Sequence, residues 1–165
     1  MMPLNRDSLS SGKYLMSFKN TPGMDWWSEE RIIASMRATL ALRPKDEPVW
    51  LFAYGSLIWN PQFEFVESSP AVLDGWRRSF CMRLVAGRGS IEQPGRMLSL
   101  APGGQTQGLA LRLAEDTLEQ ELLMVWLREM VGGAYQPDWA KLSLADGRTA
   151  CGIIFRADPQ GVMHE

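Results

Sequence analysis

The sequence has 165 residues, of which 45% are hydrophobic and 22% charged, and its formal net charge is −2. This length and composition are typical of one soluble globular domain with a sizeable core. The slightly acidic balance argues against a nucleic-acid binder that works through bulk positive charge, and no apolar run approaches the length of a membrane-spanning helix. We therefore expect neither nucleic acid nor a membrane as a partner.

The scarcity of cysteine and histidine restricts the chemistry further. Cys81 and Cys151 are too few for a disulfide framework or a zinc site, and they indicate a reducing compartment. Residues 1–24 are polar, which predicts a poorly ordered lead-in without a signal peptide, so we expect a cytoplasmic protein. The only histidine is His164, whereas Ser-His-Asp and Cys-His catalysis and most zinc sites need a positioned imidazole. Catalysis would instead depend on carboxylate, Lys, Tyr, Cys or backbone groups.

The first predicted elements are a helix and a buried strand. Ser28 followed by two acidic residues marks a helix start, apolar residues then recur at helical spacing to Leu40, and the helix ends before Pro44. The bulky apolar run 49–54 predicts a strand buried on both faces, which Gly55-Ser56 brings to an end. Such a turn leaves backbone N–H groups without ladder partners, and these groups together with a Ser hydroxyl can bind an anion. The alternative is an ordinary buried strand followed by a tight turn.

Beyond Pro61 the sequence predicts short strands separated by turns. We expect strands at 63–67, 71–73, 76–84, 97–100, 108–113, 138–144 and 149–156. Segments 97–100 and 108–113 should form a hairpin around Pro102-Gly103-Gly104, and the last two strands a hairpin around Asp146-Gly147. A second long helix is expected over 115–131, ended by Gly132-Gly133. The predicted fold class is therefore α+β, mostly antiparallel, with strands outnumbering helices.

Glu129 is the carboxylate best placed for chemistry. It falls in the last turn of the second predicted helix, where the negative end of the helix dipole and apolar neighbours both favour the protonated form. We expect a raised pKa, as a general base that works near neutral pH requires. The alternative is a surface Glu on the solvated face, or one paired with Arg128.

A group of arginines provides the second chemical signal. In the span of Arg77, Arg78, Arg83, Arg88 and Arg96, Glu92 is the only acidic residue. This local positive charge suits a small anionic ligand. Scattered surface arginines on strand edges are the alternative.

Several motifs follow one another along the chain, at residues 52–61, 75–80, 93–97 and 127–130, the last followed by Tyr135. Together they closely resemble the ChaC-type γ-glutamylcyclotransferases, from about Trp26 to about Pro159. The resemblance implies a domain over 25–159 built as a small mixed, mostly antiparallel β-barrel with flanking helices. It also implies an enzyme that degrades glutathione to 5-oxoproline and Cys-Gly, without metal or organic cofactor.

The resemblance also assigns roles to residues. It implies Glu129 as the catalytic general acid and base. It further implies a substrate-binding set that holds the γ-glutamyl group, consisting of Phe52, Ala53, Tyr54, Gly55, Ser56, Leu57 and Tyr135. Two other functions stay open from the sequence: cyclotransfer on other γ-glutamyl amines, and a catalytically idle module that binds a γ-glutamyl group or another carboxylate.

The chain departs from the family pattern at two places. Ala53 stands where many members have Gly, which is a mild change within a strand. The family normally continues with a helical segment, whereas residues 160–165 form an atypical tail. We expect the apolar strand 149–156 to lose part of its cover as a result, which would lower stability, favour self-association and weaken or abolish activity.

Overall fold

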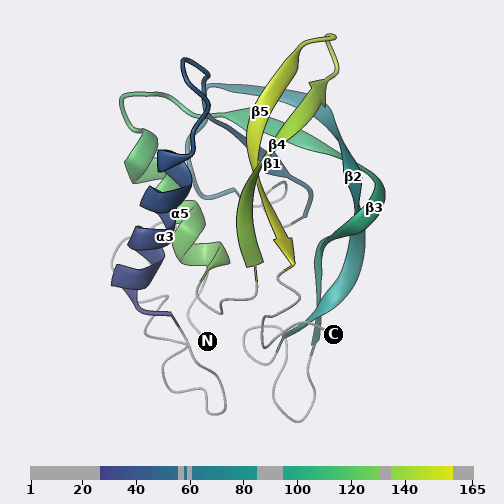
Figure 1. Cartoon of the computed structure of the whole chain (residues 1–165), viewed down its shortest axis with the longest axis horizontal. Helices are drawn as coiled ribbons and strands as arrows, with labels where there is room; N and C mark the ends of the chain where they lie inside the picture. Colours follow the sequence, from purple (N-terminus) through teal and green to yellow (C-terminus); the bar gives the residue numbers. More distant parts are fainter. Residues whose placement is uncertain (1–26, 56–57, 59–60, 85–94, 131–134, 158–165) are drawn as a thin grey trace.

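The computed structural model describes residues 27–55, 58, 61–84, 95–130 and 135–157. Within these ranges five strands form a closed barrel, and two helices lie side by side against one flank of it (Figure 1). In chain order the elements are α3 Glu29–Ala41, β1 Trp50–Ala53, β2 Glu67–Leu84, β3 Gly95–Arg112, α5 Leu118–Glu129, β4 Tyr135–Leu144 and β5 Thr149–Ala157. The predicted α+β barrel with flanking helices is confirmed.

The barrel closes through one parallel pair of strands. Around the barrel the order is β1-β3-β2-β4-β5, and β5 returns to β1 in parallel, with Trp50 opposite Gly152 and Leu51 opposite Ile153. The other four pairings are antiparallel. This closure places the C-terminal ends of β1 and β5 at the same end of the barrel.

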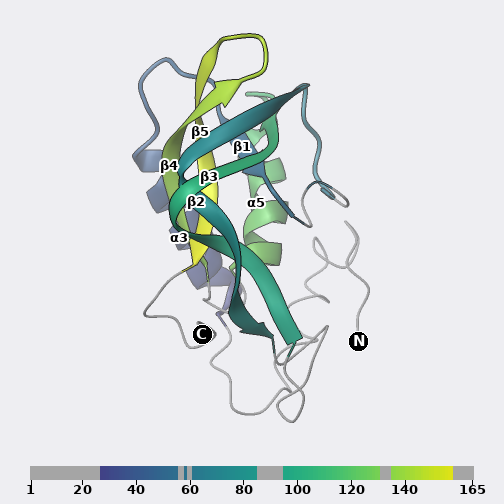
Figure 2. The same ribbon diagram turned by 90° about the vertical axis from the view of Figure 1, so that its right-hand side faces the viewer.

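The prediction of a hairpin between 97–100 and 108–113 is wrong, because residues 97–100 and 108–112 lie in the single strand β3. The strands expected at 71–73 and 76–84 are likewise parts of one long strand, β2, which pairs with β3 along its length. The strand expected at 63–67 does not form, since β2 begins only at Glu67. Gly75, Gly103 and Gly104 have positive φ angles of 90°, 101° and 70°, and the register shifts between Asp74 and Trp76. These glycines form bulges that bend the β2–β3 ribbon rather than turns that end a strand, and Figure 2 shows its curvature.

Two apolar clusters hold the barrel and the helices together. One contains residues from all five strands and fills the barrel interior, including Phe52, Leu100 and Ile154. The other lies between the barrel wall and the helices and includes Leu51 and Trp126. Because successive side chains of β1 point alternately into the two clusters, the strand is buried on both faces, as the sequence predicted.

Both helices bury the apolar faces that their spacing predicted, although α5 begins at Leu118 rather than at the expected residue 115. Ser28 caps α3 by accepting a hydrogen bond from the Arg31 backbone N–H at 3.2 Å, and Ile32 and Met36 are buried. The apolar face of α5 is buried against the barrel and α3, with Trp126 fully enclosed. None of the helices in the described residues combines the length and apolar character that crossing a membrane requires.

The last hairpin also follows the sequence prediction, but the expected loss of cover on β5 does not occur. Gly147 takes a φ of 91° in the turn between β4 and β5. Ile153, Ile154 and Phe155 are 0%, 1% and 2% exposed. Ile153 and Phe155 pack in the cluster that contains α5, while Ile154 points into the barrel. The expectation of an exposed apolar strand is therefore wrong, because α5 already covers its outer face. The tail at 160–165 and the lead-in at 1–24 lie outside the described residues.

Candidate active site at one end of the barrel

The residues that the sequence singled out converge on one end of the barrel. The last residues of β1 and β5, the first residue of β4 and the last turn of α5 all lie at the lower end in Figure 1. Tyr54 and Gly55 follow β1, Glu129 ends α5, and Tyr135 begins β4. The topology thus brings the segment that follows β1 together with the end of α5 and the start of β4, which come much later in the sequence.

The segment that follows β1 is anchored in the core. Tyr54 is 8% exposed, and its hydroxyl donates a hydrogen bond of 2.5 Å to the Phe155 backbone oxygen on β5. The Ile58 backbone N–H donates to the Gly55 oxygen at 2.9 Å, which closes a tight turn where the sequence predicted one. Ser56 and Leu57, the other predicted binding residues of this segment, lie outside the described residues.

Phe52 and Ala53 support this segment from within the core. Both are 0% exposed, and their side chains point into the two different clusters. Strand β3 approaches them closely at Gly108: a Cβ at that position would lie 2.3 Å from the Ala53 oxygen and 2.9 Å from the Phe52 ring. Only glycine permits this contact, so Gly108 determines where the end of β1 lies relative to β3.

Glu129 lies in a sheltered position beside Arg128. The Arg128 Nε lies 3.7 Å from Glu129 Oε1, and the two side chains are only 4% and 9% exposed. The solvated-face alternative is therefore excluded, while the pairing with Arg128 is present. A nearby guanidinium favours the ionised carboxylate whereas burial favours the protonated acid, so the raised pKa expected for Glu129 stays a prediction.

Helix α5 also holds the loop that leads away from the Tyr54–Gly55 segment. Arg128 Nη1 donates to the Pro61 oxygen at 3.4 Å. About two turns earlier in the helix, the Glu121 side chain, 2% exposed, accepts a hydrogen bond of 2.7 Å from the Glu64 backbone N–H. The helix that carries Glu129 is thereby tied at two points to the chain that follows the predicted binding loop.

Phe155 on β5 contacts α5, the start of β4 and the segment after β1. The sequence indicated only a buried strand residue at this position. Its ring meets Trp126 of α5 edge-on at 4.9 Å and Tyr135 at 6.4 Å, and its backbone oxygen accepts from Tyr54. Trp126 lies one helical turn before Glu129. Apolar periodicity identified the burial of Phe155, but it carries no signal for contacts made between distant segments.

The family follows from residues 49–161, which match the model of the family described as ChaC-like protein. This chain belongs to the ChaC-like family. It is 51% identical over 162 residues to the glutathione-specific gamma-glutamylcyclotransferase of Escherichia coli (strain K12), a match that covers 98% of this chain and 70% of the relative. It is 32% identical over 101 residues to glutathione-specific gamma-glutamylcyclotransferase 1 of Danio rerio, covering 57% of this chain and 52% of that protein.

The fold of this ChaC-like protein is also found in solved structures. A crystal structure of the yeast gamma-glutamyl cyclotransferase specific to glutathione superposes with a TM-score of 0.65, covering 72% of each chain at 15% identity. At that identity the likeness concerns the fold. It agrees with the closed barrel and flanking helices described above.

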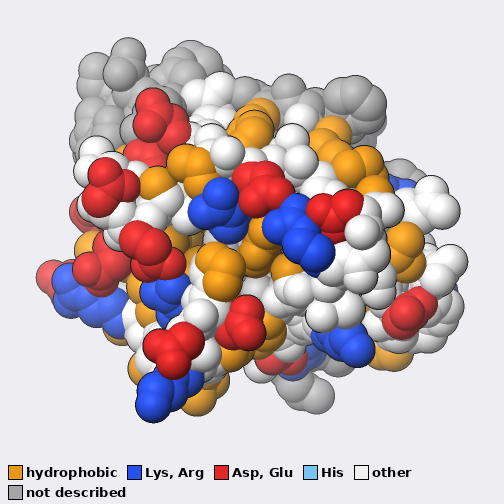
Figure 3. Space-filling view, turned by 90° about the horizontal axis from the view of Figure 1, so that it is seen from above, with side chains coloured by type: hydrophobic (Ala, Val, Ile, Leu, Met, Phe, Trp, Pro, Cys, Tyr) orange, Lys and Arg blue, Asp and Glu red, His pale blue; other side chains and the backbone are white. Residues whose placement is uncertain are grey.

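Of the predicted arginine group, the structure describes the side chains of Arg77 and Arg78 only. Arg77 is exposed, and Arg78 turns its guanidinium to two backbone oxygens, those of Tyr54 and Gln107. Arg83 and Arg96 are register partners on β2 and β3, and Arg88 lies outside the described residues. On the face that Figure 3 presents, basic and acidic side chains are interspersed among apolar ones.

A cavity of about 430 Å³ lies on the α3 side of the candidate site. Trp27, Thr39, Met130, Tyr135 and Pro137 are among its lining residues. Tyr135 and Met130 connect it to the barrel end where Glu129 lies. The described residues contain no group of three or more His, Cys, Asp or Glu side chains that could hold a metal ion.

Proposed function

We propose that this ChaC-like protein cleaves glutathione to 5-oxoproline and Cys-Gly. The α-amine of the γ-glutamyl group attacks its own γ-carbonyl carbon and closes a five-membered ring, and the bond to the cysteine nitrogen then breaks. Because nucleophile and electrophile belong to one molecule, an enzyme that holds the γ-glutamyl chain bent supplies much of the acceleration. The reaction needs neither metal nor organic cofactor, since all its bonds form and break within the substrate.

In this proposal Glu129 moves the protons. The substrate amine is an ammonium near neutral pH, and it becomes a nucleophile only after losing a proton, which Glu129 accepts. The carboxylic acid then returns this proton to the departing nitrogen of Cys-Gly. The ring nitrogen gives up its second proton to the freed amine of Cys-Gly, so that the enzyme ends in its initial state. The sheltered position of Glu129 supports this role, because its side chain is only 9% exposed and lies beside the Arg128 guanidinium.

The segment after β1 is proposed to hold the γ-glutamyl group. Its residues are Phe52, Ala53, Tyr54, Gly55, Ser56 and Leu57, with Tyr135 opposite. The first two support the segment from the core, and backbone N–H groups from Gly55 onward, with the Ser56 hydroxyl, would bind the α-carboxylate or the oxyanion that develops on the γ-carbonyl. Tyr135 would border the substrate at the start of β4.

The observation that carries the proposal is the convergence of Glu129 with the Tyr54–Gly55 segment at one barrel end. The two lie on elements far apart in the sequence. Arg128 of α5 donates to the Pro61 oxygen in the chain that follows this segment, and the Tyr54 hydroxyl donates to the Phe155 oxygen on β5. The 51% identity to a bacterial relative named for this activity and this substrate supports the same function. We also propose the cytoplasm as the location, because it is the reducing compartment in which glutathione is kept as the thiol.

Product analysis tests the proposal. Purified protein incubated with glutathione should release 5-oxoproline and Cys-Gly in equal amounts. A second incubation with a simple γ-glutamyl amine tests the broader cyclotransfer reaction, for which we expect much slower turnover. Binding of glutathione without any product would favour the idle binding module instead.

A further inference from the structure

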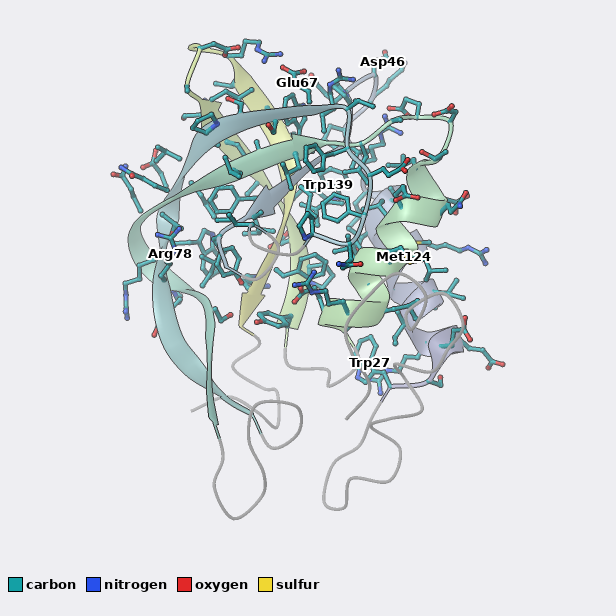
Figure 4. All side chains as sticks on the ribbon, turned by 180° about the vertical axis from the view of Figure 1, so that it is seen from behind. Trp27, Asp46, Glu67, Arg78, Met124 and Trp139 are labelled. Carbon is teal, nitrogen blue, oxygen red and sulfur yellow. The ribbon has the colours of Figure 1, made fainter. Side chains whose placement is uncertain are left out.

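Arg78 makes a contact that the proposed reaction does not yet use. Its side chain leaves β2 and donates from Nε to the Tyr54 oxygen at 3.1 Å and from Nη2 to the Gln107 oxygen. The strand order places β3 between β1 and β2, so Arg78 reaches across a whole strand to the end of β1. Figure 4 shows Arg78 on the barrel wall, on the side away from α3 and α5. A single guanidinium thus joins three strands at the start of the proposed binding segment.

The accepting oxygen belongs to the same peptide group as the Gly55 N–H. In a planar trans peptide the C=O and N–H point in opposite directions, so fixing the Tyr54 oxygen also fixes the direction of the Gly55 N–H. A cationic donor on the oxygen polarises the peptide as well, which makes its N–H a stronger donor. Arg78 therefore influences a backbone donor that it does not touch.

We propose that Arg78 is a positioning residue for the α-carboxylate of the γ-glutamyl group. It holds and polarises the Tyr54–Gly55 peptide so that the Gly55 N–H is aimed at that carboxylate. This inference rests on the proposed function, because it takes the segment after β1 as the binding loop. It differs from the expectation drawn from the arginine group, in which the guanidinium itself would meet the anion.

Arg77 provides a matched control on the same strand. It is the preceding residue, carries the same charge and is exposed, and successive side chains of a strand point to opposite faces. A change at Arg77 alters the net charge of β2 as much as a change at Arg78. It leaves the bonds to the Tyr54 and Gln107 oxygens intact.

The test measures binding by calorimetry in the Glu129→Gln background, where glutathione is turned over at least about 100-fold more slowly. Two ligands are compared: glutathione and 4-aminobutyryl-Cys-Gly, which keeps the amine and lacks only the α-carboxylate. Adding Arg78→Met should raise the Kd for glutathione about tenfold, as expected for loss of a charge-assisted donor. The Kd for the analogue should change less than about twofold, and Arg77→Met should change neither value by more than that.

Arg78→Lys separates positioning from charge. Lysine keeps the positive charge but not the planar fork that binds two carbonyls in fixed directions. We expect it to restore less than half of the affinity lost in Arg78→Met. If the thermal melt shows that Arg78→Met does not fold, the Kd values for the two ligands are compared in Arg78→Lys instead.

Three results obtained with the Arg78 variants would overturn the inference: an unchanged Kd for glutathione, an equal loss of affinity for both ligands, or full restoration by lysine. The first would remove any role in binding, the second would indicate a purely structural effect, and the third would indicate charge alone. Failure of the proposed function is read separately, from the absence of 5-oxoproline in the turnover assay of the wild-type protein. A Glu129→Gln protein that binds no glutathione would also overturn the inference, since no carboxylate site would then exist.

Discussion

The close approach of β3 to the end of β1 allows one structural prediction to be worked out in detail. A Cβ at Gly108 would lie 2.3 Å from the Ala53 backbone oxygen, and a Cβ at Gly152 would lie 2.5 Å from Leu142 Cδ1. The same substitution to alanine therefore meets a fixed backbone atom at one site and the end of a flexible side chain at the other. Bringing the first contact out to 3.0 Å requires the two strands to separate locally by at least 0.7 Å.

The cost of the two substitutions should differ accordingly. Overpacking against a fixed neighbour costs about 1–3 kcal/mol, so Gly108→Ala should lower the free energy of unfolding by about 2–3 kcal/mol. At roughly 2–4 °C per kcal/mol for a domain of this size, its Tm should fall by about 5–10 °C. At Gly152 the Leu142 side chain can rotate away, and alanine also reduces the entropy of the unfolded chain. Gly152→Ala should therefore cost less than about 1 kcal/mol.

The effect of Gly108→Ala can also be measured as a change in kcat/KM. The shift at Gly108 displaces Ala53, and with it the Tyr54–Gly55 segment that is proposed to hold the substrate. A displacement approaching 1 Å can cost about 100-fold in rate, so we expect kcat/KM for glutathione to fall at least about tenfold in Gly108→Ala. Gly152→Ala should leave it within about twofold of wild type. Equal melting temperatures and equal kcat/KM for the two variants would refute the reasoning.

Three further predictions concern the base, the loop and the pH dependence of stability. Glu129→Gln should lower kcat about 100-fold or more while glutathione still binds, because the amide cannot accept the ammonium proton; near wild-type turnover in a folded variant would exclude Glu129 as the base. Gly55→Val should abolish glutathione binding in calorimetry with little change in far-UV circular dichroism, because a branched side chain would occupy the space where backbone and ligand approach; unchanged affinity would reduce the segment to a structural turn. Hydrogen bonds from Arg148, and then from Arg112, lower the pKa of Glu67 from its ordinary value of 4.5, so their stabilisation is present above that value and is lost as the pH falls through the lowered one. Glu67→Gln should therefore flatten the acid side of the curve of Tm against pH, and an unchanged acid limb would contradict this origin.

Local signals in the sequence predicted the elements that depend on neighbouring residues. The Ser28 cap, the doubly buried β1 and the Asp146-Gly147 turn all follow from residue type and spacing within a few positions. The continuity of β3 was missed, because Gly103 and Gly104 look alike in a sequence whether they end a strand or bend it. Which of the two occurs depends on pairing with β2, and that pairing is a long-range property.

The candidate site shows the same division between local and long-range information. Glu129 was identified from its place in a motif and at a helix end, but its enclosure beside Arg128 depends on the loop packed over α5. Arg78 was noted as a charge, whereas its target is a backbone oxygen at the end of another strand. Backbone acceptors have no residue signature, so hydrogen bonds of this kind cannot be read from composition or spacing.

The central claim is intramolecular cyclisation assisted by Glu129, and isotope incorporation tests it most directly. Wild-type protein and Glu129→Gln are incubated with glutathione in water enriched in oxygen-18, and the products are analysed by mass spectrometry. We expect the wild-type protein to form unlabelled 5-oxoproline and Cys-Gly with no free glutamate, because no water enters the reaction, and Glu129→Gln to form them at least about 100-fold more slowly. Labelled glutamate as the main product would show hydrolysis instead, and would contradict the mechanism.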